Sequence, residues 1–583
     1  MKNIVLIALL AWLAASIPAR AEDLEAARKA IEAQYGRLDA AMARKHATPF
    51  EGIATSDFRY VDVSGGEFDL GQSTSLWQQS MGTFESLLAR TAVQSLAAEG
   101  EAVRALARSV LEGTLKQGNS TVKFRSEGTA DDTWVKIGTE WRLRRSGALQ
   151  SKTWVNDELV EDRTARPPLQ PALRDAIVAE LRARAIPFKT VMAGAGFDDL
   201  AALDRIVGDA RIVALGEASH GTAEFFRLKH RLFEYLVEKK GFTVFAFEAN
   251  WPVVEIADRY IKTGDGSAAA ALKEIGFWVW ATEEVRDLIE WMRAYNAVPG
   301  RGKLLSFTGF DMQAPGPAAK CVVDAFNRLG APEAENIKRL YDGTDDMYLR
   351  MDPLSLDPSK ALPDAEKARL RANVAEALKL VEQNREALLR TMTPAEYTRV
   401  RQCAAVVVQG SLPRAVKGPD MFNARDEAMA ANVKWLAEEA YPGEKVALWA
   451  HNGHIAGMSF APGLVKVMGE HLRQTFGDQM RVLGFTFDRG DVRAVRKKVP
   501  TAKAGSVEDV LLAVGLPRFV LDLRGVSPAS KLGSWLDAPQ FLRLVEAVYD
   551  PDNPATAYTT VILPKAFDAL IYIEDTTASV LLK

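Results

Sequence analysis

A strand–helix–strand pattern between residues 211 and 247 most constrains what this chain can fold into. Arg211–Leu215 is a short apolar run, Thr222–Lys239 carries apolar residues at helical spacing, and Thr243–Phe247 is rich in β-branched and aromatic residues. A connection that contains a whole helix predicts two parallel strands. The carboxyl ends of both strands then lie at one edge of the sheet, where open α/β sheets bind ligands.

Acidic and imidazole side chains follow several of the predicted strands. The first strand runs into the hexapeptide Gly-Glu-Ala-Ser-His-Gly at 216–221, and further strands are predicted at Lys303–Thr308 and Val446–Trp449. Four strand ends in all deliver such side chains to the shared edge: Glu217 with His220, then Glu248, then Asp311, and finally His451 with His454. Three of the six histidines of the chain stand at these positions. The pattern therefore predicts one site at this edge.

The residue types indicate proton-transfer chemistry. Histidine is the side chain whose pKa, about 6.5, best suits proton transfer near neutral pH. A carboxylate such as Glu217 or Glu248 can fix the tautomer of His220 and raise its basicity, so that His220 activates a water molecule. A positioned base of this kind contributes about 10²–10⁴ in rate. His451 or His454 can then polarise a carbonyl group or protonate the leaving alcohol.

Two other polar residues at this edge have plainer interpretations. Asp311 can cap the following helix or anchor its loop, or it can contact the substrate. Ser219 lacks the Gly-x-Ser-x-Gly turn that exposes a nucleophilic serine in α/β hydrolases, so we do not expect it to attack the substrate.

A long stretch without strand signals, about 315–440, separates the third and fourth of these strands. Its periodicity predicts helices, for example at Ala365–Leu388 and Pro394–Gln409. Such an insertion can wall or cover the site, or it can be a structural subdomain without a gating role. Later strands are predicted at Val482–Phe487, Phe519–Leu523 and Ala569–Ile573.

The first part of the chain, about 22–160, has a different pattern. An amphipathic helix is predicted between Leu24 and Met42. Strand-like runs follow at Phe58–Val63, Ser109–Leu115, Thr121–Ser126, Asp131–Ile137 and Glu140–Arg145. One helix followed by long strands predicts a small α+β cone. The runs "IEAQYGRLDAAMARKHA" and "WVKIGTEWRLRRS" resemble the SnoaL-like, nuclear-transport-factor-like superfamily, which implies a ligand-binding module or pairing with a second copy as a homodimer.

The remaining segments concern export and linkage. Lys2, the apolar run Ile4–Ile17 and the small residues Ala19 and Ala21 predict a signal peptide, residues 1–21, and hence a periplasmic or secreted protein. The apolar run is short for an uncleaved membrane anchor, which needs about 20 residues. The proline-rich and charged stretch 161–185 is predicted to be a linker, so that the second domain spans 186–583.

Composition excludes some classes of partner and site. The net charge of -3, from 73 basic and 76 acidic residues, gives no reason to expect binding to nucleic acid or to an anionic membrane. The two cysteines, Cys321 and Cys403, are too few for a disulfide framework or a cysteine-based zinc site. In an oxidising compartment they can pair with each other, and the sequence leaves that question open.

Six segments of the second domain belong together: "VALGEASHGTAEFFRLKHRLFEYL", "FAFEAN", "FTGFDMQ", "RDEAMAANVKWL", "WAHNGHIA" and "FDALIYIEDT". In this order they resemble the erythromycin esterase family over about residues 190–580. The resemblance implies a mostly parallel α/β core with a helical insertion and hydrolysis of an ester by activated water. It implies His220 as general base, Glu217 and Glu248 as supporting acids, and His451 as second histidine.

One position departs from the family pattern. The arginine of the macrolide esterases corresponds here to Lys229, which offers a point charge in place of a bidentate guanidinium. This departure and the extra N-terminal module weaken the case for a macrolide substrate. Lys229, His454 and Asp311 are nevertheless the residues we expect to bind the substrate.

The sequence thus favours an exported hydrolase that cleaves an ester or lactone without a cofactor. Two alternatives stay open. Glu217, His220, Glu248 and His451 can instead hold a divalent cation in a metal-dependent hydrolase. The pocket and the N-terminal module can also serve a non-catalytic protein that senses a ligand of the cell envelope.

Overall fold

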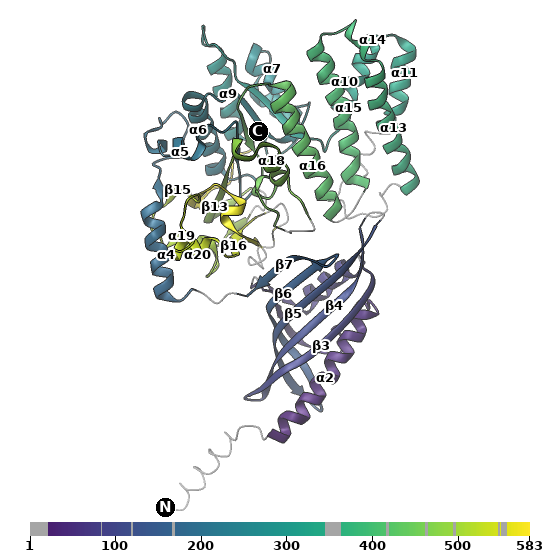
Figure 1. The fold of residues 1–583 in the computed structure, drawn as a ribbon, viewed down its shortest axis with the longest axis vertical. Coiled ribbons are helices and arrows are strands. Elements are labelled where there is room, and N and C mark those ends of the chain that lie inside the picture. The colour runs from purple at the N-terminus through teal and green to yellow at the C-terminus, as the bar shows by residue number, and fades with distance from the viewer. Residues whose placement is uncertain are drawn as a thin grey trace, which may run out of the picture. The chain divides into compact units, whose positions relative to one another are not determined.

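The computed structural model describes residues 21–582, except for 64, 83, 118–119, 166–168, 344–362, 416–418, 461–464, 494–496, 546–548 and 550–556 (Figure 1). The described residues form two compact units, the first ending at residue 165 and the second beginning at residue 169. The predicted signal peptide lies outside the described residues, apart from Ala21, the first residue of a helix. None of the described helices has the length and apolar composition needed to cross a bilayer.

The N-terminal unit is a helix packed on a strongly curved sheet, which confirms the α+β prediction. The sheet has the strand order β2-β1-β6-β5-β4-β3, with β7 paired to β6, and it is antiparallel except where β1 lies beside β6. Its elements are α2 (Ala21–Ala43), β1 (Ala54–Val61), β2 (Glu67–Asp69), α3 (Leu70–Met81), β3 (Phe84–Glu99), β4 (Ala102–Gln117), β5 (Ser120–Ile137), β6 (Glu140–Val155) and β7 (Glu158–Thr164). The SnoaL-like resemblance and pairing through this unit stay predictions.

The predicted strands of this unit differ from the structure in two respects. Thr121–Ser126 and Asp131–Ile137 belong to one strand, β5, because β4 and β6 hydrogen-bond to it on both sides throughout the intervening residues. The strand β3 was not predicted. Its many alanines and serines give little apolar alternation, and it forms by pairing along nearly its whole length with β4.

A buried carboxyl group lies in the core of the N-terminal unit. Ile31 and Tyr35 of α2 pack there against Trp134 of β5. The Tyr35 hydroxyl donates a hydrogen bond to Asp132, and Trp134 Nε1 donates to the Tyr35 oxygen at 3.1 Å. Burial raises the pKa of Asp132 from 3.8 to about 6.

This carboxyl predicts a pH-dependent stability. Because the folded state binds the Asp132 proton more tightly than the unfolded chain, its contribution is lost as the pH rises from about 4 to about 6. The loss is on the order of 3 kcal/mol. In D132N the amide oxygen still accepts from Tyr35 and no charge is buried. We therefore expect D132N to raise the melting temperature of the full chain at pH 7.5 and to have little effect at pH 4.5, measured by calorimetry. A substitution effect that is the same at both pH values would contradict this.

The second unit is built on a sheet with the strand order β11-β10-β12-β9-β13-β18-β15-β8, and β14 pairs with β13. The strands from β11 to β18 along this order are parallel, whereas β15 runs antiparallel to both of its neighbours. The strands are β8 (Ile186–Pro187), β9 (Ile212–Leu215), β10 (Val244–Asn250), β11 (Ser306–Asp311), β12 (Val446–Trp449), β13 (Met480–Val492), β14 (Lys497–Val499), β15 (Arg518–Asp522) and β18 (Ala569–Thr576). The predicted mostly parallel α/β core is therefore confirmed.

One feature of the strand order positions the site. β9 and β10 are consecutive along the chain, yet they are not neighbours in the sheet, because β12 lies between them and pairs with both. The residues that follow β12 therefore emerge between those that follow β9 and β10.

Helices cover both faces of this sheet (Figure 1). Alternate strand residues, such as Val213 and Phe245, face α5 (Leu203–Val207), α6 (Ala223–Lys240), α7 (Glu255–Thr263), α8 (Ala268–Ile275) and α9 (Glu283–Asn296). The intervening residues, such as Ala214 and Ala246, face the opposite set of helices. That set includes α4 (Pro171–Arg184), α18 (Met468–Phe476), α19 (Val507–Leu512) and α20 (Lys531–Leu536). Strands covered on both faces explain the continuous apolar runs in the sequence.

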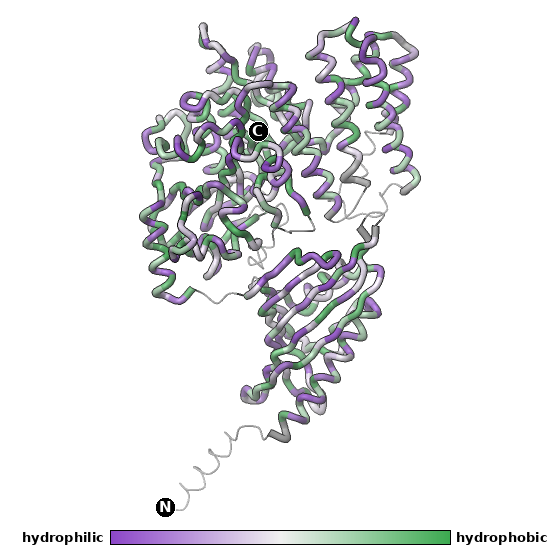
Figure 2. Tube along the Cα trace, in the orientation of Figure 1, coloured by the Kyte–Doolittle hydropathy of each residue, from purple (hydrophilic) through white to green (hydrophobic). Residues whose placement is uncertain are grey.

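The predicted insertion is helical. It contains α10 (Gly316–Asn327), α11 (Ala331–Leu340), α13 (Asp364–Gln383), α14 (Arg385–Leu389), α15 (Pro394–Ala415) and α16 (Pro419–Trp435). Figure 2 shows hydrophilic and hydrophobic residues alternating along these helices, as expected of helices that bury one face. Cys321 of α10 and Cys403 of α15 form a disulfide bond, which answers the question that the sequence left open.

Short elements complete the unit. They are α17 (Asn452–Ile455), α21 (Leu563–Ala566) and a hairpin of β16 (Gln540–Arg543) with β17 (Tyr558–Val561). The helix α4 falls within the predicted linker, but it buries Ile177, Val178 and Leu181 in the second unit, and Arg174 forms an ion pair with Asp509. The second unit therefore begins earlier than residue 186.

Candidate active site

The hexapeptide at 216–221 turns from β9 into α6, and both of its glycines have a structural reason. A Cβ atom on Gly216 would lie 2.0 Å from Asn452 Oδ1. Asn452 in turn bonds both backbone groups of Phe485 on β13. Gly221 has a φ of 79°, which favours glycine. The tight turn between them places Glu217 and His220 on one side of the strand end.

Glu217 is completely buried and accepts hydrogen bonds from three elements. Its Oε1 lies 2.7 Å from His220 Nδ1. Its Oε2 accepts from Lys229 Nζ of α6 and from Trp449 Nε1 of β12, each at 2.7 Å. Both carboxylate oxygens thus accept hydrogen bonds, and Glu217 orients the His220 ring through its Nδ1.

The charges around Glu217 keep it ionised. Burial alone would raise the pKa of Glu217, but the ammonium group of Lys229 and the hydrogen bond from His220 lower it to about 2. Burial also opposes the charged form of His220, whereas the hydrogen bond and charge of Glu217 favour it, so the pKa of His220 is raised above 6.5. An ionised Glu217 makes Nδ1 of His220 the donor and leaves Nε2 with a free lone pair. No described residue forms a hydrogen bond with His220 Nε2, and the side chain is 20% exposed.

His451 follows β12 and lies beside His220, with ring centroids 4.9 Å apart. The backbone N–H of Gly453 donates to His451 Nδ1 at 3.3 Å, so the neutral ring carries its proton on Nε2. Burial, together with the positive charge of His220, lowers the pKa of His451 to about 3. Nε2 is buried and has no hydrogen-bond partner in the described structure. The site therefore contains a neutral N–H donor, unused among the described residues, next to the His220 ring.

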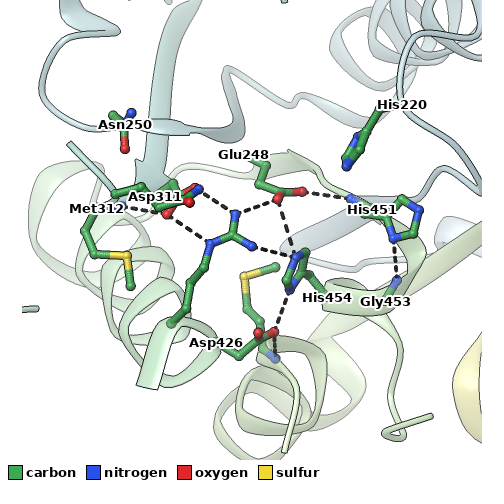
Figure 3. A network of polar contacts seen from close by, with 12 residues as sticks. His220, Glu248, Asn250, Asp311, Met312, Asp426, His451, Gly453 and His454 are labelled. Carbon is green, nitrogen blue, oxygen red and sulfur yellow. Dashed lines mark hydrogen bonds and ion pairs between the residues drawn. The ribbon is translucent and has the colours of Figure 1, made fainter. Parts of the chain in front are cut away.

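Glu248 ends up on the other side of His451 (Figure 3). Its Oε2 accepts from the backbone N–H of His451 at 3.0 Å, and its Oε1 accepts from Arg425 Nη2 at 2.7 Å. Burial alone would raise the pKa of Glu248, but the positive charge of His454 in its protonated form and that of Arg425 lower it well below its usual value. Glu248 therefore fixes the backbone of the loop that carries His451.

Arg425 of α16 connects the helical insertion to the sheet edge. Besides Glu248 it contacts Asp311 at 2.8 Å and His454 Nε2 at 2.9 Å (Figure 3). Because a guanidinium only donates, Nε2 of His454 accepts, and its Nδ1 donates to Asp426 Oδ1 at 2.8 Å. Asp311 is completely buried, and it also accepts a hydrogen bond from the backbone N–H of Met312 at 2.8 Å. The insertion thus supplies part of the site wall.

The carboxylates at this edge take part in hydrogen bonds within the chain. Glu217 and Glu248 accept hydrogen bonds on all four of their oxygens. Across the described residues, no three histidine, cysteine, aspartate or glutamate side chains are placed to hold a metal ion.

The structure brings together all the residues that the sequence placed at this edge, but in two different settings. His220 and His451 face each other, with Glu217 behind the first and Glu248 beside the second. Lys229 is completely buried behind Glu217 and has no direct access to a substrate. Ser219 is also completely buried, with its hydroxyl 2.5 Å from that of Thr222, consistent with no nucleophilic role.

Sequence reasoning missed Arg425, Asp426 and Trp449. The first two begin the segment "RDEAMAANVKWL", which carried the family resemblance without an assigned role for either residue. Trp449 is the last residue of β12, and its Nε1 reaches the carboxylate of the neighbouring strand end. Each is a polar group whose purpose becomes visible only once the strand order is known.

Comparison with known proteins decides the family. The model of the erythromycin esterase family matches residues 237–576, which is more than half of the chain. The chain belongs to the erythromycin esterase family. The match begins after Glu217, His220 and Lys229, so their assignment here rests on the geometry described above.

This chain matches the following relatives over nearly the whole length of each relative. Erythromycin esterase type II of Escherichia coli is 27% identical over 430 residues, which span 68% of this chain and 96% of the relative. A succinoglycan biosynthesis protein of known structure is 25% identical, with a TM-score of 0.60 over 71% of this chain and all of that one. A mutant of the erythromycin esterase EreC in its open conformation shares the fold at 17% identity, with a TM-score of 0.51 over 67% and 96% of the two chains. The protein is therefore a hydrolase of the erythromycin esterase family.

The Glu217–His220 pair predicts the pH profile of such a hydrolase. A base must be unprotonated, so a raised pKa of His220 places the acid limb of kcat/KM above pH 6.5. In E217Q the negative charge that favours the imidazolium is lost. We expect the acid limb to move to lower pH and the plateau to fall by about a hundredfold or more, measured with an aryl ester between pH 5 and 9. If the acid limb of E217Q has the same midpoint as that of the wild type, the proposed coupling between Glu217 and His220 is contradicted.

Proposed function

We propose that this protein is an exported hydrolase in which His220, oriented by Glu217, activates water to cleave an ester or lactone. The observation that carries this proposal is the hydrogen bond of 2.7 Å between a buried, ionised Glu217 and His220 Nδ1. It leaves the lone pair of His220 Nε2 directed away from Glu217 and free to take a proton. The adjacent His451 offers an N–H where an oxyanion needs one.

The proposed reaction uses both histidines in different protonation states. His220 Nε2 takes a proton from water as the water oxygen attacks the carbonyl carbon, and Glu217 stabilises the imidazolium that forms. His451 Nε2–H donates to the carbonyl oxygen as it becomes negatively charged. The C–O bond to the alcohol then breaks, and the imidazolium returns its proton to the leaving oxygen. Each proton is accounted for, and no group outside the chain is required except water.

A low pKa suits His451 to this role. A neutral imidazole retains its Nε2 proton throughout the reaction and acts purely as a hydrogen-bond donor. Removing one such donor from an oxyanion site in other hydrolases costs about 10²–10³ in rate. Burial of His451 and its capping contact with Gly453 support this assignment.

The substrate we propose is a bulky ester or lactone that need not be a macrolide. Named relatives include both an erythromycin esterase and a succinoglycan biosynthesis protein, so members of this fold carry different roles. Lys229, at the position of the macrolide esterase arginine, is buried behind Glu217. The exposed Trp278 of the loop before α9 offers an apolar surface of the second unit.

His220 provides the test of the activity. We expect kcat of H220N to fall by about 10²–10⁴ on every ester that the wild type cleaves, because the substitution removes the base. The asparagine amide can still donate a hydrogen bond to Glu217. H46N is the matched control, because His46 is exposed and belongs to the N-terminal unit. The measurement is steady-state hydrolysis of erythromycin, aryl esters and lactones.

The same assay addresses the metal alternative. Wild-type protein that has been dialysed against a chelator and assayed for residual metal is expected to keep its full activity. Activity that disappears on chelation and returns with a divalent cation would overturn the proposed mechanism. Equal turnover by H220N and wild type would favour a binding protein over an enzyme.

Export is the second part of the proposal. The disulfide bond between Cys321 and Cys403 supports it, because such bonds persist in oxidising compartments. We expect the mature protein from a Gram-negative host to be recovered from the periplasmic fraction and to begin at Glu22, as measured by intact mass and N-terminal sequencing. Recovery in the cytoplasm with the first 21 residues still attached would contradict export.

A further inference from the structure

Lys229 occupies a closed compartment behind the proposed base. Its side chain is completely buried. Nζ donates to Glu217 Oε2 at 2.7 Å and lies 4.2 Å from the ring centroid of Trp449 and 5.4 Å from that of Phe485. An ammonium group over aromatic faces is attracted by the ring quadrupoles, and most strongly when it is desolvated. The compartment is thus built for a cation that has no route to a substrate.

The charged groups that face Lys229 are all parts of the site. Glu217 from the β9 turn and Glu248 from β10 act on it electrostatically, and His220 shares the Glu217 carboxylate. The described rings against its ammonium group are uncharged: Trp449 of β12, Phe485 of β13 and Phe226 of α6 itself. Because Glu217 is a hydrogen-bond partner of both Lys229 and His220, it links a positive charge here to the proposed base.

We propose that Lys229 is a positioning residue that acts through Glu217 to set the pH at which His220 becomes a base. The proposal rests on the proposed role of His220 and replaces the expectation that Lys229 binds the substrate. The lysine charge balances the carboxylate that His220 also uses. It prevents Glu217 from holding the imidazolium so strongly that the proton is not released.

The direction of the effect follows from charge balance. The pair becomes active when it loses its last proton, leaving a carboxylate and a neutral imidazole. Without the lysine charge, loss of this proton leaves an uncompensated negative charge on the buried pair. The proton is therefore lost at a higher pH. Burial lowers the pKa of Lys229 to about 8, which shows how little solvent stabilises its charge. The effect of removing the charge is thus greatest below about pH 8.

K229M tests this most sharply, because methionine preserves most of the side-chain volume without the charge. We expect the acid limb of kcat/KM to move upward by about one pH unit. That corresponds to a loss of about tenfold at pH 6 and less than about threefold at pH 9, with KM little changed. E217Q is predicted to shift the limb in the opposite direction. K229R retains a positive charge and should keep the wild-type limb, whatever its melting temperature.

The matched control is K239M, the same substitution at an exposed position of α6. It should leave the profile unchanged. A K229M profile that falls uniformly at all pH values, or one that coincides with wild type, would overturn the proposal. A raised KM with an unmoved limb would restore the substrate-binding role.

A second measurement keeps the proposal falsifiable if K229M does not fold or if no ester proves to be a substrate. NMR titration of wild-type protein with ¹³C-labelled histidine reports the His220 ring directly, and H220N identifies its signal. We expect a second inflection near pH 8, as Lys229 loses its proton. A curve with one inflection would overturn the proposal. Failure of the proposed function would instead appear as absent ester turnover with this coupling intact.

Discussion

The carboxylate of Glu217 is the contact on which the rest of the site depends. It is completely buried and accepts hydrogen bonds from the turn after β9, from α6 and from β12. Removing two partners from a buried carboxylate leaves an unpaired charge that costs several kcal/mol, so the three elements are tied to one arrangement. The Glu217 carboxylate therefore fixes both the orientation of the His220 ring and the position of the end of β12.

The strand order explains how the second histidine reaches the site. Because β12 lies between β9 and β10, His451 emerges between Glu217 and Glu248, more than two hundred residues after His220 in the chain. The backbone N–H of His451 is held by Glu248, and Arg425 from the helical insertion holds Glu248 in turn. The insertion therefore completes the site by neutralising its second carboxylate.

Much of this arrangement could be predicted from the sequence, and the limits have physical causes. Short apolar runs followed by Glu217, Glu248, Asp311 and His451 predicted the strands and their common edge, because parallel strands leave few alternatives. The insertion of β12 between β9 and β10 could not be predicted, since an apolar run fits any place in a sheet that is covered on both faces.

Arg425 shows the second kind of limit. It lies on a helix, one charged residue among many on amphipathic segments, and its partners Glu248 and Asp311 are far away in sequence. Lys229 shows a third kind of limit on prediction from the sequence. The resemblance predicted an important cation there, but only the enclosing rings of Trp449 and Phe485 show that it faces Glu217 and has no access to a substrate.

The most direct test of this account is a crystal structure with a phosphonate analogue of the tetrahedral intermediate. We expect a phosphonyl oxygen within hydrogen-bond distance of His451 Nε2 and a second oxygen, in the place of the attacking water, within hydrogen-bond distance of His220 Nε2. Lys229 should remain on Glu217 without touching the analogue. A phosphorus atom bonded to Ser219, or an analogue held by a metal ion between the carboxylates, would contradict it.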